Sequence, residues 1–103
     1  SLQKSSGSAE HGGYSHFSLA SLHEQEGRVE DAIREYELAL QFDPKSPRIL
    51  ESLIPLYLHV QREKDAFQLA RRGVRMDARN PYFHLVLGEI YAKKEDGNLQ
   101  AAM

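Results

Sequence analysis

Residues 27–47 predict one amphipathic helix whose two ends are both marked in the sequence. The apolar residues of this stretch recur mostly at spacings of three and four, which places a broad apolar stripe along one side of a helix. Glu30 and Asp31 come near its start, where acidic side chains suit the positive end of the helix dipole. Asp43-Pro44 ends the helix, because proline has no amide hydrogen to donate and pushes the preceding residue out of helical geometry.

A second pattern lies upstream of this helix and returns every 34 residues. Its three copies read HFSLASLH from His16, LESLIPLY from Leu50 and HLVLGEIY from His84. The signals for helix starts have the same period. Ser46-Pro47 and Asn80-Pro81 each pair a capping residue with a proline at the first helical position. The chain is therefore built from a repeated unit of two helices.

The two halves together resemble the tetratricopeptide repeat, whose pattern is W-x2-L-G-x2-Y followed by A-x3-F and a later proline. The resemblance covers about residues 13–103. Ala32, Tyr36, Ala39 and Pro44 match the second half of the pattern, whereas Ala70 departs from the family's aromatic residue. The resemblance implies an all-α solenoid of about two and a half repeats, in which antiparallel helix hairpins stack in a right-handed superhelix.

The period also predicts how the chain is divided. Residues 1–12 are rich in serine and glycine, and we expect a flexible lead because they cannot bury enough apolar surface to offset their conformational entropy. The three units that follow are repeat 1 at 13–46, repeat 2 at 47–80 and a partial repeat 3 at 81–103. Besides the helix within 27–47, we expect helices at 14–25, 47–60, 63–76 and 81–93, then a turn at 94–97 and the start of a further helix at 98–103.

The totals fit one ordinary soluble domain, with 103 residues, 41% apolar and 27% charged. The longest apolar run, residues 53–58, is far shorter than the roughly 20 residues that span a bilayer. The chain has no cysteine, which excludes disulfides, thiolate metal sites and cysteine nucleophiles. Because it does not begin with methionine, we expect a piece of a longer repeat protein. The compartment stays open: a cytoplasmic location is slightly favoured, and export remains an alternative if a leader was removed.

The five histidines raise the question of a metal site. His16 and His84 occupy the same position of the repeat, and His23 takes the place of a packing aromatic residue. Along a helix that rises 1.5 Å per residue, His16 and His23 lie about 10 Å apart, too far for one metal ion. We therefore expect the histidines to pack at the edge of the core, with no metal and no cofactor.

The sequence patterns typical of enzymes do not predict catalysis for this chain. The sequence holds neither a G-x-S-x-G motif nor a phosphate-binding loop. Its acidic residues are spread as helix-surface residues, whereas general acid and base chemistry needs carboxylates paired in an apolar setting. We expect a protein that is not an enzyme.

The resemblance instead implies a groove that binds a peptide of a partner protein. In the family, the first helix of each hairpin lines a concave surface, and residues on its inner side contact the partner. The matching positions here are Tyr14, Phe17, Ser21, Glu24, Arg48, Glu51, Leu58, His59, Tyr82, Leu85, Glu89 and Lys93. Exposed aromatic residues among them are typical binding anchors, although they could instead pack against flanking repeats of the parent protein.

One specificity known in the family does not match. Chaperone-binding members hold a C-terminal carboxylate with lysine, asparagine and arginine side chains. The corresponding residues here are Phe17, Ser21, Ser52, Tyr82 and Val86, and none of these fits that role.

The remaining alternatives concern charge and the incomplete last repeat. One helical face within 63–79 could bind RNA or an acidic ligand; it carries Lys64, Gln68, Arg71, Arg75 and Arg79, and Arg72 flanks it. Acidic residues interrupt this face and no stacking aromatics interleave, so nucleic acid is the less favoured partner. The last repeat leaves one helix uncovered, and we expect a homodimer through Leu85, Val86, Leu87, Ile90 and Tyr91, or cover from residues 98–103.

Overall fold

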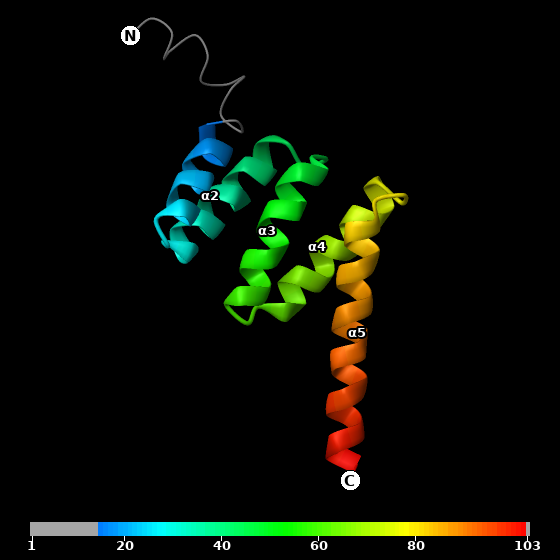
Figure 1. Ribbon diagram of the computed structural model, residues 1–103. Helices are drawn as coiled ribbons and strands as arrows, with labels where there is room; N and C mark the ends of the chain where they lie inside the picture. Colours follow the sequence, from blue (N-terminus) through cyan, green and yellow to red (C-terminus); the bar gives the residue numbers. More distant parts are fainter. Residues whose placement is uncertain (1–14, 103) are drawn as a thin grey trace, which may run out of the picture.

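The computed structural model describes residues 15–102, with side chains described through residue 95. Every secondary-structure element in this range is an α-helix (Figure 1). The helices are a first helix at 15–25, α2 at Val29–Phe42, α3 at Pro47–His59, α4 at Glu63–Met76 and α5 at Pro81–Ala102. The predicted all-α helical repeat is confirmed. Tyr14, the expected flexible lead at 1–12 and Met103 lie outside the described residues.

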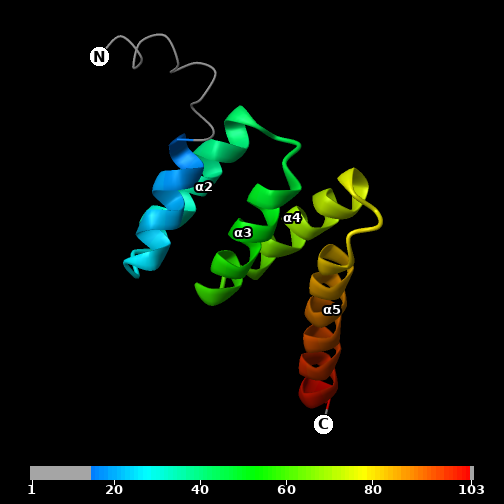
Figure 2. The ribbon, with the colours of Figure 1, turned by 45° about the horizontal axis from the view of Figure 1, so that its top comes forward.

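The helices pack in chain order, because α2 contacts α3, α3 contacts α4 and α4 contacts α5. The first helix, α3 and α5 lie side by side in one layer, with α2 and α4 in a second layer behind them (Figures 1 and 2). The C-terminal half of α5 extends beyond the ends of α3 and α4 in both views.

The two predicted proline starts are confirmed with their caps. Ser46 precedes Pro47, and its hydroxyl oxygen accepts a hydrogen bond from the Ile49 amide at 3.3 Å. Asn80 caps α5 in the same way, since its side-chain oxygen accepts from the Tyr82 amide at 2.9 Å. These caps satisfy amides that the first turn of a helix leaves without a partner, and so they fix where α3 and α5 begin.

The core combines large side chains with small ones at the positions where helices cross. The largest fully buried side chains are Tyr36, Phe83, Ile33, Leu50, Leu53 and Ile54. The small fully buried side chains are Ala20, Ala32, Ala39, Ala66 and Ala70. A close contact joins α4 to α5: a Cβ atom at Gly73 would lie 2.4 Å from Cδ1 of Phe83. The ring of Phe83 therefore occupies the space that a side chain at position 73 would need.

The two turns inside the hairpins share one backbone conformation. Gly27 has a φ of 78°, and Gln61, one period later, has a φ of 65° although it is not a glycine. The closing hydrogen bonds correspond as well, from the Arg28 amide to the His23 carbonyl at 2.8 Å and from the Arg62 amide to the Tyr57 carbonyl at 2.7 Å. The second repeat thus keeps the left-handed turn without the residue that adopts it most easily.

Replacing Gln61 with glycine is expected to raise the free energy of unfolding by about 0.5–1 kcal/mol, because the left-handed backbone costs a non-glycine residue about 1–2 kcal/mol. The gain stays below that cost, since glycine also gives the unfolded chain more freedom. Urea unfolding followed by circular dichroism measures the change. The reciprocal control is Gly27→Gln, which should destabilise the chain by a similar amount, and a stabilising Gly27→Gln would contradict this interpretation.

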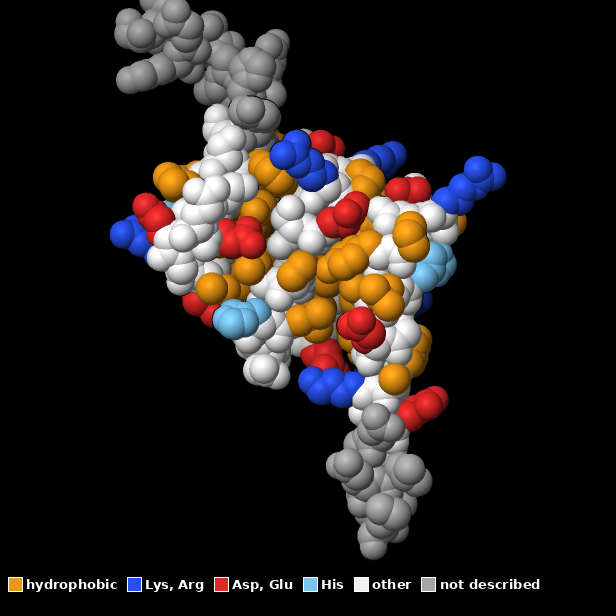
Figure 3. Space-filling model, viewed as in Figure 1, with side chains coloured by type: hydrophobic (Ala, Val, Ile, Leu, Met, Phe, Trp, Pro, Cys, Tyr) orange, Lys and Arg blue, Asp and Glu red, His pale blue; other side chains and the backbone are white. Residues whose placement is uncertain are grey.

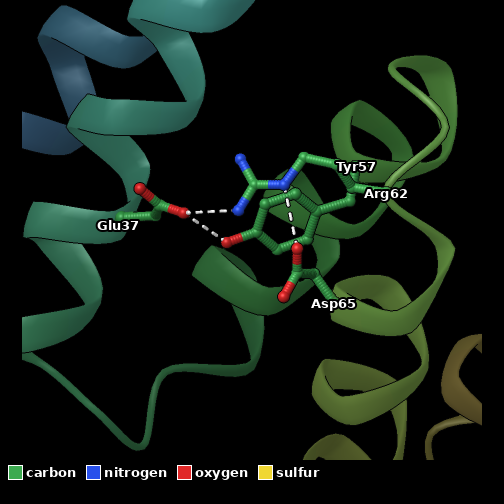
Figure 4. Close-up of polar contacts among 4 residues, drawn as sticks. All are labelled: Glu37, Tyr57, Arg62 and Asp65. Carbon is green, nitrogen blue, oxygen red and sulfur yellow. Dashed lines mark hydrogen bonds and ion pairs between the residues drawn. The ribbon is translucent and has the colours of Figure 1, made fainter.

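A polar cluster joins the first hairpin to the second (Figure 4). The Tyr57 hydroxyl of α3 donates to Glu37 Oε2 of α2 at 2.5 Å. Arg62 lies over the Tyr57 ring, 4.6 Å from its centre, and pairs with Asp65 at 2.8 Å and with Glu37 at 3.6 Å. Burial, followed by the hydrogen bond and charge of Glu37, raises the pKa of Tyr57. Tyr57 is therefore held as a neutral donor between the hairpins.

The end of the chain differs from the prediction. The expected turn at 94–97 and the new helix from Asn98 are wrong, because α5 continues from Pro81 to Ala102. A single glycine inside a helix costs only about 1 kcal/mol relative to alanine, so Gly97 permits a turn without imposing one. Gly27 differs because it leads into α2, whose buried side can pack back on the first helix.

Candidate functional site

One layer of the molecule carries most of the predicted binding residues. We call the surface formed by the first helix, α3 and α5 the A face. Figure 3 shows hydrophobic side chains gathered over α3 and α5 on this face, with acidic side chains among them. The predicted groove residues differ in exposure. Five of them are half-buried, namely Phe17, Ser21, Glu51, Leu58 and Tyr82. Six are exposed, namely Glu24, Arg48, His59, Leu85, Glu89 and Lys93. Tyr14 lies outside the described residues.

Phe17 and Tyr82 are less exposed than expected for free anchors. The ring of Phe17 meets Tyr36 edge-on at 5.4 Å, and the Arg48 guanidinium covers it 4.5 Å from its centre. Tyr82 packs edge-on against Phe83 at 5.8 Å. Phe17 thus lies against α2 and Tyr82 against its neighbour within α5, and both rings are half-buried, so only part of each can contact a partner.

A hollow of about 190 Å³ opens between α3 and α5 on the A face. Leu58 and Ile90 supply its apolar lining, and Glu63, Glu89 and Lys93 supply charged lining. Lys93 pairs with Glu63 at 3.5 Å. The sequence predicts Leu58, Glu89 and Lys93 for this site but not Gln61 or Glu63, and it assigns Ile90 to self-association, although all three also line the hollow. The one available signal was that Gln61 stands one period after the turn residue Gly27.

Carboxylates on each of the three helices face polar neighbours. Glu51 accepts a hydrogen bond from the Asn80 amide group at 2.9 Å, and Glu24 accepts from the Tyr36 hydroxyl at 2.8 Å. Burial raises the pKa of Tyr82, and the negative charges of Glu51 and Glu89 raise it further. Burial likewise raises the pKa of Tyr36; the Ser21 hydrogen bond opposes this shift, and Glu24 adds to it. Both tyrosines therefore remain neutral beside these acids.

The predicted self-association residues divide into two sets. Val86 and Ile90 are each 3% exposed, so they are buried within one chain and the expectation that they form a bare patch is wrong. Leu85 and Tyr91 are 58% and 54% exposed, and Leu87 is half-buried. The sequence marks all five as apolar, but it does not show that α4 and the hairpin before it already cover one side of α5.

The basic side of α4 also carries a hollow, of about 310 Å³, lined by Gln68, Leu69, Arg71, Arg72 and Arg75. Two of these arginines already have contacts within the chain. Arg72 donates to the Pro44 carbonyl at 2.6 Å, and the Arg71 guanidinium lies 5.8 Å from the centre of the Phe67 ring.

Histidines occupy packing and pairing positions. His16 stacks on Phe42 at 5.6 Å, and its Nδ1 lies 2.6 Å from Glu35 Oε1. His84 Nε2 lies 2.7 Å from the Ala78 carbonyl oxygen. Within the described residues, no three histidine, aspartate or glutamate side chains come together as a metal site would require. Over the same residues, none of the helices has both the length and the apolar character needed to cross a membrane.

Comparison with known proteins gives one family match. The family model described as Tetratricopeptide repeat matches residues 15–56. The matched range contains the first helix, α2 and most of α3, and so it includes two of the three helices of the A face. No curated protein matches the chain.

Proposed function

Since this chain carries a tetratricopeptide repeat at residues 15–56 and such repeats generally mediate protein–protein interaction, we propose that it binds a peptide segment of a partner protein across the A face. The family is typically a non-catalytic scaffold, and we propose no enzymatic activity and no cofactor for this chain. In this proposal the first helix, α3 and α5 each contribute side chains to one continuous binding surface.

The observation that carries this proposal is the hollow between α3 and α5. Its apolar lining, Leu58 and Ile90, lies beside charged and polar groups of three elements. Ligand sites commonly combine an apolar floor with a few polar groups that fix orientation, and binding energy concentrates where a side chain of the partner fills such a pocket. An apolar side chain of a bound peptide would contact Leu58 there.

Leu58→Ala is expected to weaken peptide binding about tenfold, because the variant loses roughly 1–2 kcal/mol of apolar contact. Peptides selected from a displayed random library on the purified chain serve as the probe, and calorimetry gives their dissociation constants. The control is Leu40→Ala, which removes an equally half-buried leucine from α2 and should leave the affinity unchanged. Equal affinities of the parent chain and Leu58→Ala would contradict binding in the hollow.

Mapping of the same selected peptides locates the surface independently of any variant. Amide chemical-shift changes should concentrate in the first helix, α3 and α5. Changes confined to α2 and α4 would place the partner on the other layer and overturn the proposal.

The second candidate function is RNA or acidic-ligand binding through α4. The hollow lined by Arg71, Arg72 and Arg75 favours it, since basic side chains gather there on one helix. The hydrogen bond of Arg72 to the Pro44 carbonyl and the contact of Arg71 with the Phe67 ring weigh against it. Salt titration with an uncharged peptide separates the two functions, because nucleic-acid affinity falls steeply with salt whereas the binding of uncharged side chains to an apolar hollow responds weakly.

We also propose a division of the chain into repeats and a surface for self-association. We place the units at 13–46, 47–80 and 81–103, which the matching turns at Gly27 and Gln61 support.

With Val86 and Ile90 buried, a homodimer would use Leu85, Leu87 and Tyr91 beside the half-buried Phe67, which meets Tyr91 edge-on at 5.6 Å. Sedimentation at micromolar concentration tests it, and a strict monomer would exclude it.

A further inference from the structure

We infer that the peptide bound across the A face is cationic, with lysine or arginine side chains that pair with Glu24, Glu51 and Glu89 and an apolar side chain that enters the hollow beside Leu58. This inference rests on the proposed function, because it assigns the chemistry of the partner that the A face would bind.

The first argument is that each helix of the A face carries an acid without an ion pair. Six acidic side chains of the described residues have cationic or histidine partners: Asp31 with Arg34, Asp65 and Glu37 with Arg62, Glu26 with Arg28, Glu63 with Lys93 and Glu35 with His16. Among the other described acids, Glu30, Asp43, Asp77 and Glu95 lie away from the three helices' shared surface or at its far end, and the remaining three are Glu24, Glu51 and Glu89. The described lysines, arginines and histidines include none within ion-pair distance of Glu24, Glu51 or Glu89. The A face therefore holds one such acid on each of its three helices.

The second argument is the capacity left on these carboxylates. Glu24 accepts from the neutral hydroxyl of Tyr36, and Glu51 accepts from the neutral amide of Asn80. A carboxylate offers about four lone-pair sites, so each can accept further bonds from a ligand. The existing bonds hold the acids in place without neutralising them, and a preorganised acceptor costs a ligand less to bind.

The third argument is that the charges act on a common region. Glu51 belongs to α3 and Glu89 to α5, yet the charges of both act on the Tyr82 hydroxyl. Two like charges over a partly apolar surface give a negative potential that attracts cations and repels phosphate. This face is therefore a poor fit for nucleic acid or an acidic peptide.

The described cations of the A face form no ion pair with these acids. The Arg48 guanidinium lies over the Phe17 ring of the first helix. Lys93 is paired with Glu63 at 3.5 Å. Glu89 lines the same hollow as Leu58, so the fitting sequence has an apolar residue next to a lysine or arginine.

The test uses three labelled peptides of about 12 residues, long enough in extended form to span roughly 40 Å. They share their apolar positions and carry lysine, glutamine or glutamate at the positions between. Fluorescence anisotropy should show the lysine peptide binding about tenfold more tightly than the glutamine peptide, with the glutamate peptide weakest. Added salt should reduce the advantage of the lysine peptide, because partly exposed charges are screened.

The protein variant for this test is Glu51→Gln with Glu89→Gln. Glutamine keeps an acceptor for Asn80, and circular dichroism verifies the fold. Affinity for the lysine peptide should fall about tenfold, while affinity for the glutamine peptide should not change. The matched control is Glu30→Gln with Asp43→Asn, which removes two exposed acids at the ends of α2 and should leave both affinities unchanged.

The outcomes separate this inference from the proposed function. Equal binding of all three peptides, or the tightest binding by the glutamate peptide, overturns the cationic assignment. If Leu58→Ala still weakens binding in that case, the A face remains the binding surface. If neither these peptides nor library-selected ones perturb the first helix, α3 or α5, the proposed function fails and the cationic partner fails with it.

Discussion

Phe83→Ala is expected to lower the free energy of unfolding by about 3–5 kcal/mol, the usual cost of removing a fully buried aromatic ring. Phe83 has no exposed surface, lies in the first turn of α5 and fills the space over Gly73 of α4. Domains of this size are stable by roughly 5–15 kcal/mol, so the loss removes a large share of the total. The packing of α5 against α4 should weaken first.

Urea unfolding of the whole chain measures this loss. The control is Leu85→Ala, two residues along the same helix, where the side chain is 58% exposed. Surface changes usually stay within about 0.5 kcal/mol, so a loss at Leu85 as large as that at Phe83 would show that burial is not the cause.

Gly73→Ala is expected to destabilise the chain by a net 1–3 kcal/mol or so, because overpacking a filled core forces ring and backbone to shift. The new Cβ would lie 2.4 Å from Cδ1 of Phe83 and 2.5 Å from its Cγ. The result is unusual in sign, since glycine to alanine inside a helix otherwise stabilises by about 1 kcal/mol. Thermal and urea unfolding both report the change.

Gly88→Ala is the matched control for this effect. A Cβ at Gly88, also inside a helix, would meet no atom within 4 Å, so this variant should gain about 1 kcal/mol. Combining Gly73→Ala with Phe83→Leu should cost less than the sum of the two single changes, because a smaller side chain relieves the clash. Strict additivity would contradict direct contact between the two positions.

Much of the fold follows from the sequence because its signals are local and repeated. The helices at 47–60 and 63–76 were predicted to within a residue of α3 and α4, since prolines, caps and small residues mark their register. The conformation of the turn at Gln61 was harder to predict, because glutamine does not indicate a left-handed backbone. The continuation of α5 through Gly97 was missed, because the weak preference of glycine for a turn had no packed helix to support it.

The candidate site was less predictable, because a helical pattern shows which side of a helix is apolar but not which neighbour covers it. Phe17 and Tyr82 were expected as exposed anchors, yet Tyr36 and Phe83 cover part of each ring. Val86 and Ile90 were expected at a bare surface and are buried. Ion pairs such as Glu35 with His16 and Glu63 with Lys93 depend on distances across helices, which spacing along one helix does not contain.

The matching turns at Gly27 and Gln61 bear on how such a chain can evolve. Both close with the same backbone bond although their side chains differ, so the geometry of a hairpin does not depend on one residue type at its tip. A tandem duplication of residues 47–80 would present to its neighbours the same turn and the same proline-capped entry to the next helix. The gene can therefore lengthen by whole hairpins, and each added unit supplies a new helix whose surface residues are free to diverge.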